Sequence, residues 1–148
     1  MLEAMSASVS SSGAPARGLI VVGVDGSEPS RKALRWAVRE AELRRADVRV
    51  VHCYWAAPLL VDGPGPGGAD PEQVVRDFVA DTVGNQTAVE ITPVAIQARQ
   101  ASAALVDEAN GADLLVVGSR GVGGFSGLLL GSVSQQCSHH APCPIVIV

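Results

Sequence analysis

The residues best suited to chemistry lie in the segment that begins at Gly118 and ends at Ser134, GSRGVGGFSGLLLGSVS. Glycine lets a ligand approach the main chain closely, and six of the first fourteen residues are glycine. A glycine-rich turn between a strand and a helix exposes backbone N–H groups at the positive end of the helix dipole. The segment therefore predicts a phosphate-binding loop, although the glycines alone are equally consistent with a surface loop that binds nothing.

Two common phosphate-binding loops are excluded by this sequence. A Walker A loop needs a lysine before its Ser/Thr, and the only lysine in the chain is Lys32. The dinucleotide fingerprint G-x-G-x-x-G is also absent, because Ser126 stands where the third glycine should be. The loop therefore belongs neither to a P-loop NTPase nor to a standard NAD site.

Composition narrows the class of protein. The chain of 148 residues suggests one domain, and 47% hydrophobic residues with only 3% aromatic residues predict an aliphatic core. A formal charge of −4 argues against nucleic acid or an acidic membrane as a partner. Three cysteines without a CxxC motif suit the reducing cytosol, so a cytoplasmic location is expected. No apolar run approaches the roughly 18 residues of a membrane helix, and no signal peptide is recognisable.

Alternating strand and helix patterns must position the loop. Residues 1–17 are rich in Ser and Ala and predict a disordered tail, which leaves 18–148 as the domain. Short apolar runs predict strands, and helical stripes with N-cap and Gly or Pro boundaries predict helices between them. Such alternation predicts a parallel sheet with helices on both faces. The expected strands are 19–24, 48–54, 89–96, 114–117 and 145–148, and the expected helices are 28–45, 71–83, 102–110 and 128–140.

The glycine spacing matches a known signature. Gly118, two residues, Gly121, nine residues and then Gly131-Ser132 resembles the G-2x-G-9x-G-(S/T) pattern of the universal stress protein family, in its ATP-binding branch. The opening VVGVDGS at 21–27 and the ending HAPCPIVIV at 140–148 resemble the family's first strand and turn and its last helix end and strand. The resemblance covers nearly all of the chain after residue 17.

The resemblance implies a single-domain α/β fold, Rossmann-like and similar to the adenine nucleotide alpha hydrolases. Its doubly wound sheet has five parallel strands in the order 3-2-1-4-5, with helices on both faces. That order agrees with Pro93, because proline inside a strand is confined mostly to edges and bulges. Strands 1 and 4 then lie side by side, and Asp25 and Gly118 sit at their carboxyl ends, where such sheets bind ligands.

The implied nucleotide site draws on both ends of the domain. Asp25 would bind a ribose hydroxyl, the adenine amino group or a phosphate-bound Mg²⁺; the alternative is a simple Asp-Gly turn. Arg120 either neutralises phosphate charge or points to water, and residues near Val51 would line the adenine pocket. The predicted cofactor-binding residues are Gly23, Asp25, Gly118, Ser119, Arg120, Gly121, Gly131, Ser132, Val133 and Ser134.

The implied function is that of an ATP-binding module, with Mg²⁺, that regulates a stress response through a downstream protein partner. No catalytic residue is assigned, and the histidines and cysteines near the C-terminus fit no zinc spacing. The alternatives are a slow Mg-dependent ATPase or phosphotransferase that uses Asp25, and a nucleotide-free adaptor. One departure from the family is the stretch RQAS at 99–102, where many relatives have a G-x-P-A turn.

The C-terminal strand predicts the assembly. The segment that begins at Cys143 and ends at Val148 is apolar and would lie at an edge of the sheet. An uncovered apolar edge favours pairing with another chain, and in the family this strand pairs with its own copy. We therefore expect a homodimer through this strand.

Overall fold

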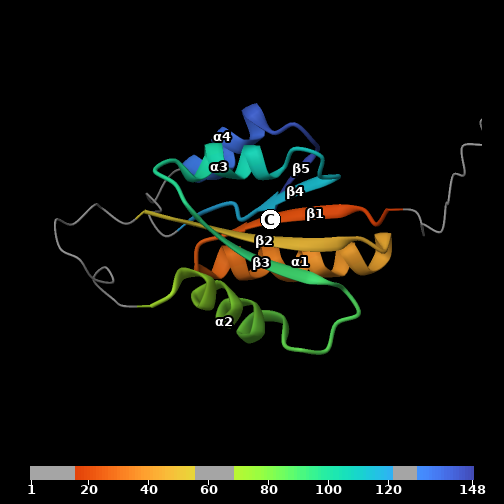
Figure 1. Cartoon of the computed structure of the whole chain (residues 1–148). Helices are drawn as coiled ribbons and strands as arrows, with labels where there is room; N and C mark the ends of the chain where they lie inside the picture. The colour runs from red at the N-terminus through yellow and green to blue at the C-terminus, as the bar shows by residue number, and fades with distance from the viewer. Residues whose placement is uncertain (1–15, 56–68, 122–129) are drawn as a thin grey trace, which may run out of the picture.

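The computed structural model describes residues 16–55, 69–121 and 130–148. The predicted tail lies almost wholly outside the described residues, as do eight residues of the glycine-rich loop, 122–129. Strands and helices alternate along the described chain (Figure 1). The elements are β1 (Leu19–Val24), α1 (Glu28–Arg44), β2 (Asp47–Tyr54), α2 (Pro71–Val83), β3 (Ile91–Gln97), α3 (Ala101–Glu108), β4 (Leu114–Val117), α4 (Ser132–His140) and β5 (Ile145–Ile147).

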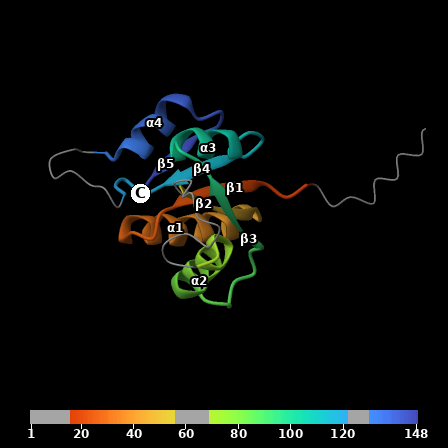
Figure 2. The same cartoon turned by 60° about the vertical axis from the view of Figure 1, so that its left-hand side comes forward.

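The strands form one parallel sheet in the order β3-β2-β1-β4-β5, which confirms the predicted fold class. Helices α1 and α2 cover one face of the sheet, and α3 and α4 cover the other (Figures 1 and 2). Because β1 is central and covered on both faces, Ile20, Val21 and Val22 are completely buried. Aliphatic side chains dominate the core on each side of the sheet, as the composition predicts.

Capping residues fix where the first two helices begin. Ser27 has an extended backbone and accepts a hydrogen bond from the Ser30 N–H, so it is the N-cap of α1. Asp70 caps α2 in the same way by accepting from the Glu72 N–H, and Pro71 follows as the first helical residue. Both starts agree with the sequence prediction. The N-terminus of α1 lies directly after β1, at the carboxyl edge of the sheet.

Pro93 lies within edge strand β3, as predicted. The Glu90 carbonyl accepts from the Val48 N–H, and the Ala98 N–H donates to the Tyr54 carbonyl, so the even-numbered residues bond to β2. Alternate residues of a strand bond to opposite sides. The nitrogen of Pro93 therefore faces the open edge, where its missing N–H costs no ladder hydrogen bond.

The predicted start of the last helix at residue 128 is wrong. The helix begins at Ser132, and Gly131 is its N-cap with an extended backbone (φ −69°, ψ 164°). The apolar residues before Gly131 suggested a longer helical stripe, but Leu130 lies outside the helix and lines a cavity instead. The other boundaries either coincide with the predicted ones or differ from them by one or two residues, as frayed element ends commonly do.

Candidate functional site

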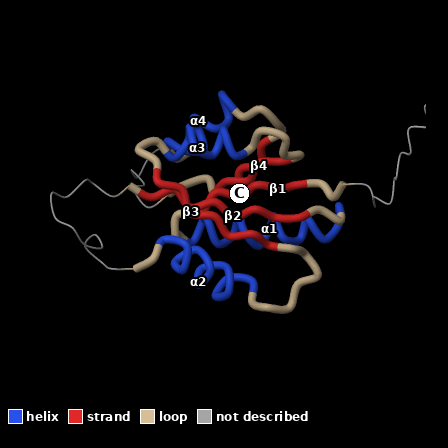
Figure 3. Tube along the Cα trace, in the orientation of Figure 1, coloured by secondary structure: helices blue, strands red, loops and turns tan. Residues whose placement is uncertain are grey.

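A cavity of about 350 Å³ lies at the carboxyl edge of the sheet, where β1 and β4 end. The chain leaves β1 for α1 on one face and leads from β4 to α4 on the other face (Figure 3). Cavities in doubly wound sheets form at such a crossover point. The cavity is lined by Gly23, Val24, Asp25, Ser30, Val51, Cys53, Ala101, Leu105, Val117, Gly118, Arg120, Gly121, Leu130, Gly131, Ser132, Val133 and Ser134.

One end of the cavity is built from the glycine loop and the start of α4. A Cβ at Gly118 would lie 3.0 Å from the carbonyl carbon of Pro29, so any larger residue there would have to displace the backbone of α1. The N-cap of α4, Gly131, has no side chain that could cap the helix. The N–H groups of its first turn, including those of Ser132 and Val133, have no partner within the helix. They give this end of the cavity the positive character that attracts anions.

Asp25 is held in place at the same end. One carboxylate oxygen accepts hydrogen bonds from the N–H (2.9 Å) and the hydroxyl of Ser27. A Cβ at Gly121 would lie only 2.7 Å from the other oxygen, so glycine at 121 makes room for the carboxylate. The end of β1 and the loop after β4, which are about 90 residues apart in sequence, therefore meet at this carboxylate, as the sequence predicts.

Ser119 and Ser134 hold the loop together. The Ser119 N–H donates to the Val148 carbonyl (2.8 Å), and its own carbonyl accepts from the Gly131 N–H (2.7 Å). The buried Ser134 hydroxyl donates to the Gly131 carbonyl at 2.9 Å. Ser134 still lines the cavity, but Ser119 does not. The backbone N–H and carbonyl of Ser119 are thus both bonded within the protein, and its predicted contact with a ligand stays a prediction.

The other end of the cavity is apolar. Val51 and Cys53 reach it from β2, and Ala101 and Leu105 reach it from α3. Gly23 allows this packing, because a Cβ there would lie 2.7 Å from Leu105 Cδ1. Residues near Val51 were predicted to line the pocket, but Cys53 was given no role. Strand alternation could have found it, since Cys53 is two residues further along β2 and therefore faces the same side.

The thiols near the cavity are not suited to nucleophilic chemistry. Burial, together with the charge of Glu108, raises the pKa of the Cys53 thiol above 9.0. Burial and the neighbouring Cys53 raise the pKa of the Cys137 thiol to about 11. The thiolate is the reactive form, so both groups are neutral and unreactive near pH 7. All three cysteines of the chain are free.

Charged groups are few among the described residues that line the cavity: Asp25 and Arg120. Arg120 lines the cavity and is exposed to solvent. Within ranges 16–55, 69–121 and 130–148, no group of three or more His, Cys, Asp or Glu side chains is arranged to hold a metal ion. In those ranges, no helix has the length and apolar character needed to span a membrane.

The chain is similar to proteins of known family along most of its length. The model of the universal stress protein family matches residues 17–148. A universal stress protein of Mycolicibacterium smegmatis is 34% identical over 145 residues, covering 87% of this chain and 47% of that protein. One from Thermus aquaticus is 35% identical over 133 residues, covering 87% of this chain and 96% of that protein. The chain thus spans about half the length of the mycobacterial relatives that it matches.

Solved structures of the family share this fold. A universal stress protein in complex with cAMP superposes with a TM-score of 0.68 and 30% identity, over 90% of this chain and 97% of that chain. The universal stress protein from Archaeoglobus fulgidus in complex with dAMP gives a TM-score of 0.61 and 25% identity, over 88% of this chain and 96% of that one. With the family match, the topology and the glycine pattern in agreement, this chain belongs to the universal stress protein family.

Proposed function

We propose that this chain binds an adenine nucleotide in the cavity, with the phosphates at the α4 end and the base at the apolar end. The observation that carries the proposal is the polarity of the cavity. One end has an uncapped helix N-terminus beside a glycine loop, and the other has Val51, Cys53 and Leu105. Phosphate favours the first environment and a flat purine favours the second. Relatives in complex with cAMP and dAMP support the choice of adenine.

ATP with Mg²⁺ is the nucleotide that we propose within this class. Magnesium keeps several waters and binds through one or two carboxylates together with substrate phosphates, rather than in a cage of protein ligands. Asp25 fits that role, because it is the carboxylate among the described residues of the cavity and lies on the side of Gly118 and Gly121. Arg120 would offset the remaining charge of the phosphates.

Binding for regulation, rather than rapid turnover, is the activity that we propose. Phosphoryl transfer needs a positioned water or base and strong charge neutralisation at the transferring phosphate. The described residues of the cavity supply one carboxylate and one guanidinium, which suits a binding module for a stress response. A slow Mg-dependent ATPase is the alternative that the experiment below separates.

Nucleotide binding is tested most sharply at Ser132, which is exposed at the first position of α4. In Ser132→Asp, a carboxylate near the helix N-terminus is favourable for the helix but repels phosphate. Its matched control, Ser132→Asn, has the same shape without the charge. We expect ATP-Mg affinity to fall by about tenfold or more in Ser132→Asp relative to Ser132→Asn, with no loss of thermal stability.

The measurement is calorimetric titration of the full chain, together with the nucleotide released when the purified protein is denatured. Intact ATP in the released nucleotide supports a binding module, and mainly ADP supports slow hydrolysis. A wild-type chain that carries no nucleotide and does not bind added ATP-Mg would contradict the proposal and favour a nucleotide-free adaptor. Equal binding by the two Ser132 variants would contradict the phosphate position.

A further inference from the structure

Trp55 and Arg99 form a stacked pair outside the residues that line the cavity. The Arg99 guanidinium lies 4.7 Å from the centre of the Trp55 ring. Trp55 is 48% exposed, and it is one of three large hydrophobic side chains exposed in the described chain. No salt bridge involves Arg99 within that part of the chain. The pair therefore presents an aromatic surface and an uncompensated cation to solvent.

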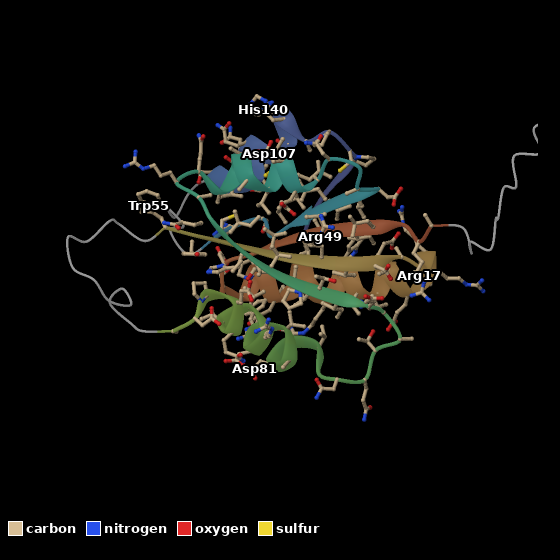
Figure 4. All side chains as sticks on the ribbon, viewed as in Figure 1. Arg17, Arg49, Trp55, Asp81, Asp107 and His140 are labelled. Atoms are coloured by element: carbon tan, nitrogen blue, oxygen red, sulfur yellow. The ribbon has the colours of Figure 1, made fainter. Side chains whose placement is uncertain are left out.

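The pair continues the apolar wall of the cavity outward. Trp55 follows the last residue of β2 and is two residues beyond Cys53. Arg99 is two residues before Ala101, the first residue of α3. Cys53 and Ala101 both line the apolar end. Figure 4 shows Trp55 at the carboxyl end of β2, beside the start of α3. A hydrogen bond from the Ala98 N–H to the Tyr54 carbonyl (2.9 Å) keeps the two segments paired at this point.

We propose that the Trp55–Arg99 pair is the outer wall of the base subsite and contacts the purine of the bound nucleotide. This inference rests on the proposed function, in which the base occupies the apolar end. The indole offers a flat surface for stacking, which every purine can use. The guanidinium carries only donors, so it would bond to the acceptor nitrogens of the purine ring.

The sequence explains why this position matters in this chain. The stretch that leads into the third helix is RQAS at 99–102, which departs from the G-x-P-A turn noted above for many relatives. Helix α3 begins at Ala101 after Gln100, which makes no side-chain capping hydrogen bond. Arg99, the first residue of this stretch, instead reaches across to Trp55, the residue that follows β2. The contact therefore joins the two segments that precede the cavity-lining Ala101 and follow the cavity-lining Cys53.

A purely structural stack is the competing explanation. In that case, removal of either side chain would lower the stability of the fold and would reduce the affinity for every ligand of the cavity by the same factor. If the pair contacts the base, removal of either side chain would instead weaken the binding of nucleotides. The binding of an inorganic polyphosphate would not change, because the polyphosphate occupies only the end of the cavity at α4. Comparison of ATP with inorganic tripolyphosphate therefore separates the two roles.

The experiment measures the dissociation constants of ATP-Mg and of tripolyphosphate-Mg for the full chain and its variants. The variants are Trp55→Leu and Arg99→Gln. The control is Arg39→Gln, which removes an exposed arginine from α1 on the opposite face of the sheet. We expect ATP to bind about tenfold more weakly to Trp55→Leu and about threefold more weakly to Arg99→Gln. Tripolyphosphate should bind all four proteins within about twofold of one another.

A second readout reports contact directly. The chain has two tryptophans, so Trp36→Phe leaves Trp55 as the only indole. We expect ATP to change the Trp55 emission with the same midpoint as the binding curve, and tripolyphosphate to leave it unchanged. The inference would be overturned if Trp55→Leu and Arg99→Gln both bound ATP with wild-type affinity, or if they lost equal affinity for ATP and tripolyphosphate. The proposed function would still stand. A wild-type chain that binds no nucleotide would overturn both.

Discussion

Asp25 combines two roles at the scale of the single residue. Its carboxylate accepts two hydrogen bonds from Ser27, the N-cap of α1, and it also lies against Gly121 in the loop after β4. A negative charge in that place repels a metal-free triphosphate and attracts one that carries Mg²⁺. In the proposed nucleotide site, the residue would therefore set whether the metal-free or the Mg²⁺-bound form of the nucleotide is preferred.

Asp25→Asn should remove that preference while keeping acceptor capacity toward Ser27. We expect the ratio of ATP dissociation constants without and with Mg²⁺ to fall by about tenfold, because both the metal ligand and the repulsion are lost. Titration in Mg²⁺ and in EDTA measures the ratio. Asp81→Asn, an exposed carboxylate change on α2 (Figure 4), is the control and should behave as wild type. An unchanged ratio in Asp25→Asn would place the metal elsewhere.

Single residues show where sequence reasoning succeeds and where it stops. Asp25 and Gly118 were predictable, because a residue that follows a buried parallel strand must lie at the carboxyl edge of the sheet. The contact of Gly118 with Pro29 was not predictable, since it depends on how α1 leaves β1. The hydrogen bond of the Ser119 N–H was not predictable for a related reason. The N–H is taken by Val148, a partner that only the β4–β5 pairing brings near.

At the scale of elements, the packing of α4 involves the buried thiol of Cys137. Cys137 on α4 is fully buried, and its thiol contacts the Ser102 carbonyl of α3 at 4.0 Å. Ser134 and Cys137 are the buried residues of the helix, so Cys137 is its one buried apolar side chain. Conditions that charge the thiol should therefore loosen α4 before they affect the rest of the fold.

The pH dependence of stability follows from the Cys137 pKa of about 11 in the folded state against 9.0 for a free thiol. Well below pH 9 the Cys137 thiol is protonated in both the folded and the unfolded state, so its contribution to the free energy of unfolding is complete. Between pH 9 and 11 the unfolded chain ionises first, so the free energy of unfolding falls, by up to about 2–3 kcal/mol. Urea unfolding of wild type and Cys137→Ala should show a constant gap below pH 8.5 or so that narrows above pH 9. A gap that stays constant up to pH 11 would contradict the shift.

The start of α4 could not be predicted from the pattern of apolar residues. The three leucines before Gly131 have helical character, and nothing in their spacing shows that Leu130 faces a cavity. Gly131 was the available signal, because glycine with an extended backbone commonly caps a helix start. The starts of α1 and α2 were predicted correctly, since Ser27 and Asp70 are N-cap types followed closely by proline.

For the whole molecule, we propose a homodimer through β5, which lies at an edge of the sheet. The Pro144 carbonyl accepts from the Leu115 N–H and the Val148 N–H donates to the Val117 carbonyl, so even-numbered residues bond to β4. By alternation, the N–H and C=O groups of Ile145 and Ile147 face the open edge. That edge offers a ready ladder to a second copy.

Ile147→Pro should separate the copies and spare the fold, because it removes an outward N–H and leaves the bonds to β4 in place. We expect sedimentation velocity to show a dimer for wild type and a monomer for Ile147→Pro. The control is Ile147→Val, which trims the side chain only and should remain dimeric. A folded Ile147→Pro dimer, with an unchanged circular dichroism spectrum, would show that β5 is not the interface.

The order of the strands was the most predictable feature of the whole molecule. Alternating strands and helices predict a parallel sheet, Pro93 favours an edge strand, and the glycine signature identified the family whose order the sheet follows. The apolar end of the cavity was the least predictable feature. It is assembled by tertiary packing of β2 and α3, and the side chains there, such as Leu105 and Cys53, look like ordinary core residues in the sequence.

The hydrogen bond from the Ser119 N–H to the Val148 carbonyl joins the loop at the cavity to the segment that follows β5. A ligand that shifts the loop must act on this bond, and so must a second chain that shifts β5. The two proposed binding events would then share a coupling free energy, which is reciprocal by thermodynamic necessity. Whatever factor a bound nucleotide imposed on the dimer dissociation constant, dimerisation would impose the same factor on the nucleotide dissociation constant.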